Sequence, residues 1–117
     1  MTRDDLMWLS GFLEGEGCFT RVLGRSRKPE TWHAKVVVEN TDEDVMLRVQ
    51  QLIGAKTLGS YESQRYRGAK KSYTAAITGP KALALMIEVY PYMGSRRKGR
   101  ILELLSAWEH HREASLD

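Results

Sequence analysis

The sequence predicts an α+β fold in which helices cover one face of an antiparallel sheet. Two regions, 18–39 and 56–78, each hold two strand-like segments, and a helix-like segment follows each region. One helix precedes the first region and another ends the chain, so the expected order is αββαββαα. Hairpins packed under helices are typical of the α+β class. The polar face left uncovered is then free to meet solvent or a ligand.

The first helix is predicted to begin at Thr2, because Thr2 and Asp5 have the spacing of a reciprocal capping pair. Apolar residues then recur at helical spacing and predict one buried stripe, formed by Leu6, Leu9, Phe12 and Leu13. Gly11 and Gly15 lie on the opposite side of this helix. We expect the helix to end near the glycines at 15–17.

Strands are predicted at 18–25 and 31–39, joined by a basic turn. The second strand alternates most clearly, with one face formed by Trp32, Ala34, Val36 and Val38, and the other by His33, Lys35, Val37 and Glu39. A helix at 42–53 follows, with apolar positions at Val45, Leu47, Val49 and Leu52. Gly54 is a natural helix end.

The second half repeats this plan. Strands are predicted at 56–66 and 71–78 around a turn at Arg67 and Gly68, and Pro80 opens a third helix. Pro91 and Gly94 end that helix. The last helix is expected at 95–112, with a frayed polar tail and a core stripe of Ile101, Leu104, Leu105 and Trp108.

Composition limits the classes of function. Hydrophobic residues make up 42% and charged residues 28%, which is ordinary for a globular chain, and the net charge is +3. A single cysteine, Cys18, excludes an intrachain disulfide, and no zinc-ligand spacing occurs. The chain shows no signal peptide, and its longest apolar run, 82–89, is too short to cross a membrane. We therefore expect one intracellular domain, 1–117, in the cytoplasm or an organelle matrix.

Basic residues gather in three clusters beside turns. They are Arg21, Arg25, Arg27 and Lys28; Arg65, Arg67, Lys70 and Lys71; and Arg96, Arg97, Lys98 and Arg100. Clusters that converge on one face bind phosphates, and clusters that do not are a solvated surface. Charge alone leaves both interpretations open.

The stretch Glu14–Gly17, with the sequence Glu-Gly-Glu-Gly, is the segment that indicates a chemical function. Carboxylates at the end of a helix oppose its macrodipole, which is locally unfavourable and a hint of function. Paired carboxylates suit a hard divalent cation. The alternative is a solvated helix end with a glycine cap, and these four residues alone favour that alternative.

A longer match changes the balance. Leu9–Gly17 resembles the LAGLIDADG motif of homing endonucleases at every position, and Cys18 and Phe19 resemble the small and aromatic residues that follow it. The stretch 90–98 resembles the family's proline turn and basic entry into its last helices. The resemblance implies the αββαββα fold, with an antiparallel sheet shaped as a saddle and helices on one face, and a metal-dependent DNA endonuclease.

The resemblance also implies roles for particular residues. Glu16, with Gly15 beside it, is the expected metal site for Mg²⁺, with Mn²⁺ as a substitute, although Asp is usual where this chain has Glu16. Arg96 is the expected basic residue near the scissile phosphate, with Lys98 as the alternative. Asp42, Thr41 or Glu39 is expected to orient water. No small-molecule cofactor is expected.

A single-motif chain of this family pairs with a second copy, so we expect a homodimer on a near-palindromic DNA site. The expected interface residues are Met7, Trp8, Gly11 and Gly15. The expected contacts to double-stranded DNA are Thr20, Arg21, Arg25, Arg27, Lys28, His33, Lys35, Glu39, Arg65, Arg67, Lys70, Lys71, Ser72 and Thr74. Strict alternation places Arg21 with Phe19 toward the core, which predicts a bulge or an edge position there.

Two other functions remain open from the sequence. One is a DNA- or RNA-binding protein of the same fold, such as a maturase or regulator, that does not cleave. The other is an unrelated α+β interaction module whose acidic glycine stretch only caps a helix. Metal-dependent cleavage separates the first from an endonuclease, and DNA affinity at low salt separates the second.

Overall fold

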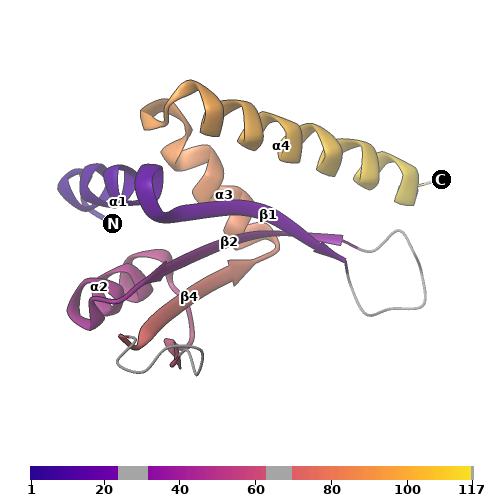
Figure 1. Cartoon of the computed structure of the whole chain (residues 1–117). Helices are drawn as coiled ribbons and strands as arrows, with labels where there is room; N and C mark the ends of the chain where they lie inside the picture. The colour runs from indigo at the N-terminus through magenta and orange to yellow at the C-terminus, as the bar shows by residue number, and fades with distance from the viewer. Residues whose placement is uncertain (24–31, 63–69, 117) are drawn as a thin grey trace.

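The computed structural model describes residues 1–23, 32–62 and 70–116. The elements, in chain order, are α1 (Arg3–Glu16), β1 (Gly17–Leu23), β2 (Trp32–Asn40), α2 (Glu43–Ile53), β3 (Gly59–Tyr61), β4 (Ser72–Thr78), α3 (Pro80–Val89), the 3₁₀ helix η1 (Tyr90–Tyr92) and α4 (Ser95–Leu116). This order is the predicted one (Figure 1). Both predicted hairpin turns lie outside the described residues, as do five of the predicted DNA contacts: Arg25, Arg27, Lys28, Arg65 and Arg67.

The four strands form one antiparallel sheet in the order β1-β2-β4-β3. Figure 1 shows α3 and α4 lying over one side of this sheet. Residues Trp32, Ala34, Val36 and Val38 of β2 are buried beneath the helices, while the residues between them are exposed or half-buried. The alternation read from the sequence is confirmed, and it separates a covered face from an open face.

The start of α1 forms as predicted. The Thr2 hydroxyl accepts a hydrogen bond from the Asp5 backbone N–H at 3.1 Å, and the Asp5 carboxylate accepts one from the Thr2 N–H at 3.3 Å. These bonds, with a smaller contribution from nearby Arg48, lower the pKa of Asp5 below its ordinary value. Leu9 and Leu13 are fully buried, and Leu6 and Phe12 pack against the core at its margin.

The buried residues of α2 coincide only in part with the apolar positions named from the sequence, since Val49 is buried and Leu52 packs against the core. Leu47 is 43% exposed, whereas Met46, Val49 and Ile53 are buried. Because residues 45–47 are all apolar, the sequence allows more than one side of the helix to face the core. Packing against the sheet buries the side that carries Met46. Gly54 ends the helix with a left-handed φ of 74°, as predicted.

The second hairpin and the last helices also differ in extent. Among the described residues, strand β3 has 3 residues and begins later than predicted, because the chain uses 54–58 to turn from α2 into the sheet. Ile87 of α3 is a large apolar residue that is 60% exposed. Helix α4 continues to Leu116, so the tail expected to fray is helical, and the His111 ring lies 5.8 Å from that of Trp32. Within the described part of the chain, no helix is long and apolar enough to span a bilayer.

Candidate metal and DNA site

The end of α1 leads directly into β1. Glu16 is the last helical residue, and the Gly17 N–H donates to the Leu13 carbonyl while its φ of −80° and ψ of 154° are already extended. A Cβ at Gly17 would lie 2.9 Å from both the Leu13 carbonyl oxygen and its Cδ2. This change from helix to strand therefore requires glycine, and it leaves the Glu16 side chain exposed at the junction.

The other acid of this segment, Glu14, is engaged within the protein. Its carboxylate accepts a hydrogen bond from the Gly94 N–H at 3.2 Å and lies 4.0 Å from Nε of Arg97. A Cβ at Gly94 would come within 2.7 Å of the Glu14 carboxylate, so glycine permits this approach. Glu14 thus fastens α1 to the start of α4.

Two arginines of α4, which the sequence pattern placed only within the basic cluster at 96–100, hold the same junction. Arg97 donates from Nε to the Glu14 carbonyl at 2.8 Å and also donates to the Gly17 carbonyl. Arg100 donates from Nε to the Phe19 carbonyl at 3.1 Å and pairs with Glu103 at 3.2 Å. The sequence signal for such a contact is the unbalanced charge at the end of α1, which has two acids and no basic residue in its last turn.

The remaining charged residues of this region are more available. Within the described residues, Glu16 and Arg96 make no hydrogen bond, ion pair or ring contact with another side chain, and both are exposed. The ammonium of Lys98 lies 5.5 Å from the centre of the Tyr90 ring. An open pocket of about 580 Å³ lies between β1 and α4, lined by residues that include Gly17, Cys18 and Arg96. Arg96 is thus the freer of the two predicted cations.

The oxygen donors at the junction suit a hard divalent cation. Glu16 offers a free carboxylate, and Gly15 lies at the helix end, where backbone carbonyls lack partners within the helix. No group of three or more His, Cys, Asp or Glu side chains that could hold a metal occurs among residues 1–23, 32–62 and 70–116. A cation bound here would complete its shell with water, phosphate or a second subunit.

Asp42 is the N-cap residue of α2 and is exposed. Its backbone N–H donates to Oδ1 of Asn40 at 2.9 Å, and its carboxylate makes no capping hydrogen bond. Thr41 and Glu39 are also exposed. The three residues considered for orienting water therefore sit together where β2 ends, and all face solvent.

The open face of the sheet carries most of the described DNA-contact candidates. Thr20 of β1 lies opposite Lys35 of β2, which lies opposite Thr78 of β4. The same face continues through pairs of directly opposed residues: Val22 with His33, Glu39 with Thr74, and Ser72 with Tyr61. Hydroxyl, amine, imidazole and carboxylate groups thus alternate across one surface. Such groups can contact base edges in a major groove.

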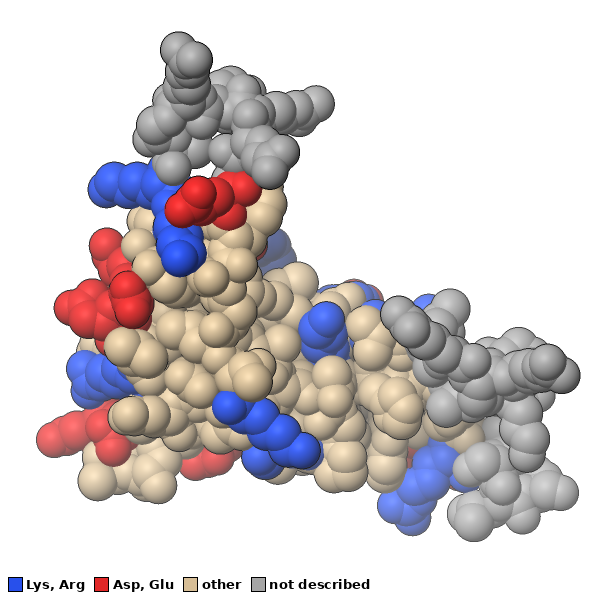
Figure 2. All heavy atoms as spheres, turned by 90° about the horizontal axis from the view of Figure 1, so that it is seen from below, with Lys and Arg blue, Asp and Glu red and all other residues tan. Residues whose placement is uncertain are grey.

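Arg21 lies on the other face. It is opposite Ala34, which is buried, and its guanidinium carbon is 5.7 Å from the centre of the Trp32 ring. The pairing of β1 with β2 is unbroken and β1 is an edge strand, so the edge position explains the charged side chain and there is no bulge. Lys70 and Lys71 are exposed immediately before β4. In Figure 2, most acidic side chains lie in the left half of the view, while Lys and Arg side chains lie in both halves.

The profile of the LAGLIDADG endonucleases matches residues 9–101, most of the chain. The chain belongs to the LAGLIDADG endonuclease family. The family resemblance, the fold and the nuclease class predicted from the motif are thereby confirmed. A comparison with curated protein sequences gave no match.

Solved structures of this family share the fold. The homing endonuclease I-CeuI, solved with DNA, superposes with a TM-score of 0.67 at 17% identity, over 99% of this chain and 59% of its own. I-CvuI in complex with its target gives 0.63 at 18%, over 91% and 69%. The archaeal I-Vdi141I with DNA gives 0.62 at 13%, over 89% and 67%. This LAGLIDADG chain therefore spans about three fifths to two thirds of the length of these structures.

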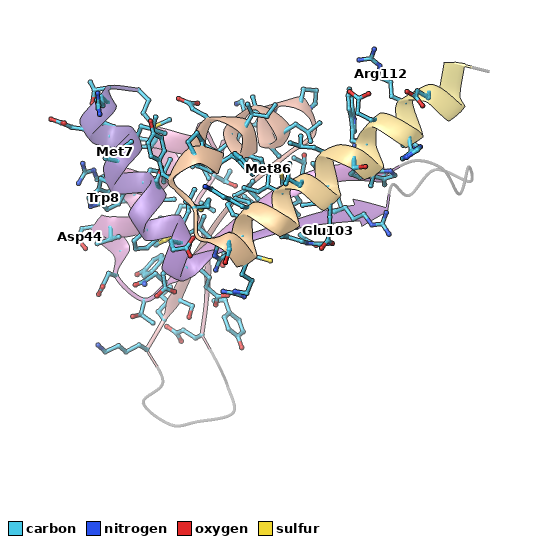
Figure 3. The ribbon with its side chains drawn as sticks, turned by 90° about the horizontal axis from the view of Figure 1, so that it is seen from above. Met7, Trp8, Asp44, Met86, Glu103 and Arg112 are labelled. Atoms are coloured by element: carbon cyan, nitrogen blue, oxygen red, sulfur yellow. The ribbon has the colours of Figure 1, made fainter. Side chains whose placement is uncertain are left out.

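The outer side of the LAGLIDADG helix α1 is open. A Cβ at Gly11 or Gly15 would meet no atom within 4 Å. Gly11 and Gly15 thus form an open strip along α1. Beside it, the Trp8 ring stacks on Phe12, with centroids 5.5 Å apart. Figure 3 shows Met7 and Trp8 on α1 at the edge of the molecule. The strip is smooth enough for the backbone of a second helix to approach closely.

Proposed function

We propose that this chain is a site-specific double-stranded DNA endonuclease that hydrolyses phosphodiester bonds with a divalent cation. The observation that carries the proposal is the exposed, unpaired carboxylate of Glu16 at the end of the LAGLIDADG helix. That carboxylate follows a segment that Glu14 and Arg97 hold in place. A free acid on a fixed backbone is what a metal-dependent nuclease requires.

Glu16 and Gly15 would hold the cation, for which Mg²⁺ is the expected choice and Mn²⁺ a substitute. A cation bound there activates water and neutralises charge on the phosphate. The similar structures of I-CvuI were solved with DNA in the presence of 2 mM Ca or of 2 mM Mg, the latter with uncleaved DNA. Arg96 supports the same chemistry, because an exposed guanidinium beside the pocket can pair with a phosphate oxygen.

The open face of the sheet is the proposed DNA-reading surface. A two-stranded β-ribbon fits the major groove, where side chains distinguish base pairs by their donors and acceptors. Lys35, His33 and Thr20 supply donors on this face, and Glu39 supplies an acceptor. Lys70 and Lys71 lie next to it and suit contacts to phosphates, which give affinity without sequence preference.

We infer a homodimer from the α1 face. The chain has one motif, and cleavage of both strands needs two metal sites, hence two copies of Glu16. Packing of α1 against its symmetry mate through Gly11 and Gly15 would bring the two Glu16 residues together near the two-fold axis. Such a dimer would read a near-palindromic site.

The test is cleavage of a randomised duplex library by the wild type, Glu16→Gln and the matched control Glu88→Gln, which removes an exposed carboxylate of α3. Removing the ligand is expected to lower the cleavage rate about a thousandfold, the equivalent of about 4 kcal/mol. Binding measured in Ca²⁺ should persist in both variants.

Each outcome decides between functions. Discrete double-strand cuts that are lost only in Glu16→Gln support the endonuclease. Enrichment of bound DNA without cleavage in Mg²⁺ or Mn²⁺ would instead support a binding protein of the same fold, such as a maturase or regulator. No enrichment at low salt would contradict a DNA function altogether.

A further inference from the structure

One guanidinium group holds the backbone on both sides of Glu16. Arg97 donates to the carbonyl of Glu14, two residues before Glu16, and to the carbonyl of Gly17, the residue after it. The Arg97 side chain is only 13% exposed, so these bonds form in a site that is largely shielded from water. The short segment that carries the free carboxylate is therefore fixed at both ends.

A second contact runs in the opposite direction. The Glu14 carboxylate accepts from the Gly94 N–H, just before α4, while Arg97 of α4 donates to the Glu14 carbonyl. The two elements thus hold each other through backbone and side-chain atoms at once. Arg100 adds a third bond, to Phe19 of β1. Rotation of the α1 end relative to α4 would break all of these bonds together.

The electrostatics explain why an arginine is suited to this position. Helix α1 ends with two acids and has no basic residue in its last turn, so negative charge and the negative end of the helix dipole coincide. Arg97 supplies a positive charge to this point from another helix. Its planar guanidinium carries several donors and can bind two carbonyls at once, which a lysine ammonium on its flexible stem does less well.

We propose that Arg97 is a positioning residue for Glu16. It fixes the backbone around Glu16 and thereby the place and direction of the carboxylate that binds the cation. This inference rests on the proposed metal role of Glu16. It gives neighbouring residues different roles. Both line the pocket, but Arg96 is exposed and makes no hydrogen bond or ion pair among the described residues, whereas the Arg97 side chain is 13% exposed and bonded to two backbone carbonyls. Residues that orient a metal ligand without touching the metal typically contribute about 10–100-fold to metal affinity or activity.

The experiment compares the wild type, Arg97→Gln and Arg97→Lys as full-length proteins on a duplex recovered from the library. Single-turnover cleavage is measured against Mg²⁺ concentration. Metal binding is measured apart from cleavage, by titrating Mn²⁺ into the complex with a phosphorothioate duplex and recording free Mn²⁺ by electron paramagnetic resonance. The matched control is Lys81→Gln, because the Lys81 ammonium donates to the Gly54 carbonyl at 2.9 Å and so makes the same kind of contact at the end of α2.

We expect Arg97→Gln to raise the half-saturating Mg²⁺ concentration and the Mn²⁺ dissociation constant at least about tenfold. DNA affinity measured without divalent ions should stay within about twofold, since the contacts of Arg97 among the described residues are with Glu14, Gly17 and Phe19, none of which lies on the open face. Arg97→Lys should restore thermal stability but only part of the metal affinity. Lys81→Gln should leave both metal constants unchanged.

A folded Arg97→Gln with wild-type metal constants would overturn the inference. If Arg97→Gln does not fold, Arg97→Lys decides in the same way: raised metal constants support positioning, and unchanged constants overturn it. A wild type that neither cleaves DNA nor binds Mn²⁺ would overturn the proposed function itself, and the role of Arg97 with it. A wild type that cleaves, with constants insensitive to Arg97, would overturn only the role of Arg97.

Discussion

The guanidinium carbon of Arg48 lies 4.0 Å from the centre of the Trp8 ring, and the same guanidinium lies 3.6 Å from the Asp5 carboxylate. Arg48 belongs to α2, whereas Trp8 and Asp5 belong to α1, so this one side chain joins the two helices. The Trp8 ring in turn stacks on Phe12. Trp8 and Phe12 border the proposed dimer face, and Arg48 of the same subunit therefore holds the Trp8 ring in position.

Replacing Arg48 with methionine should destabilise the subunit modestly. Methionine keeps an apolar stem over Trp8 but removes the charge, and a partly exposed cation–π contact contributes about 0.5–1 kcal/mol. That loss corresponds to a fall of about 2–5 °C in melting temperature for a chain of this size. Thermal unfolding of Arg48→Met measures it, with the exposed Arg3→Met as control. Equal effects of the two substitutions would contradict a specific role for the Trp8 contact.

The capping box predicts a pH-dependent contribution to stability. Hydrogen bonds from Thr2, and then the nearby Arg48 charge, lower the pKa of Asp5 in the folded protein. A lowered pKa means that the contribution is present above the unfolded value of about 3.9 and is lost as pH falls through the folded value. Wild type should therefore exceed Asp5→Asn in urea midpoint at pH 7 and 5, and the difference should shrink as the pH falls below the unfolded pKa and through the lowered folded pKa.

Asp4→Asn is the matched control for this experiment, because Asp4 lies in the same helical turn outside the capping box. It should reduce stability less than Asp5→Asn at pH 7. A difference between wild type and Asp5→Asn that stays constant from pH 7 to pH 3 would show that the ionised carboxylate is not what stabilises the helix end.

The approach of Glu14 to Gly94 predicts a coupled pair of substitutions. A methyl group at Gly94 would come within 2.7 Å of the Glu14 carboxylate and displace it from the Gly94 N–H. Gly94→Ala should therefore cost about 1–2 kcal/mol, the usual contribution of a hydrogen bond to a charged group at a partly exposed site. In a Glu14→Ala background the same change should cost little, because the displaced group is absent. Denaturant unfolding of the four proteins gives the coupling, and additive costs would contradict the contact.

Much of the sheet was predictable because its signal is local. Along β2, residues alternate between the covered and open faces, and Trp32 to Val38 show that period directly in the sequence. Which side of α2 faces the core could not be read from the local sequence. Val45, Met46 and Leu47 are all apolar, and only packing against the sheet favours burial of Met46. The length of α4 was missed for a similar reason. Its last turns are polar, but His111 packs beside Trp32, which is distant in sequence.

The candidate site divides in the same way. The position of Glu16 followed from its motif, because the residues that define the motif are contiguous. The partnership of Glu14 with Arg97 joins residues 83 positions apart, and no pattern of spacing within either segment indicates it. The basic cluster at Arg96 to Arg100 looked uniform in the sequence. The structure divides it, because Arg97 and Arg100 bind backbone carbonyls of α1 and β1, whereas Arg96 makes no such bond among the described residues, although all three line the pocket.

The open strip on α1 predicts that a substitution there can impair dimerisation without impairing folding of the subunit. Gly11→Leu should leave the subunit folded, because a side chain at this position meets no atom within 4 Å and leucine favours a helix over glycine. In the proposed dimer the same side chain would push the paired helices apart, and overpacking of this kind costs about 1–3 kcal/mol. The dissociation constant should therefore rise about 5- to 150-fold, and double-strand cuts should fall. Sedimentation over a concentration series measures the change, with Gly99→Leu as the control because Gly99 of α4 is equally open. If both leucine variants dimerise as the wild type does, the subunits meet through a surface other than α1.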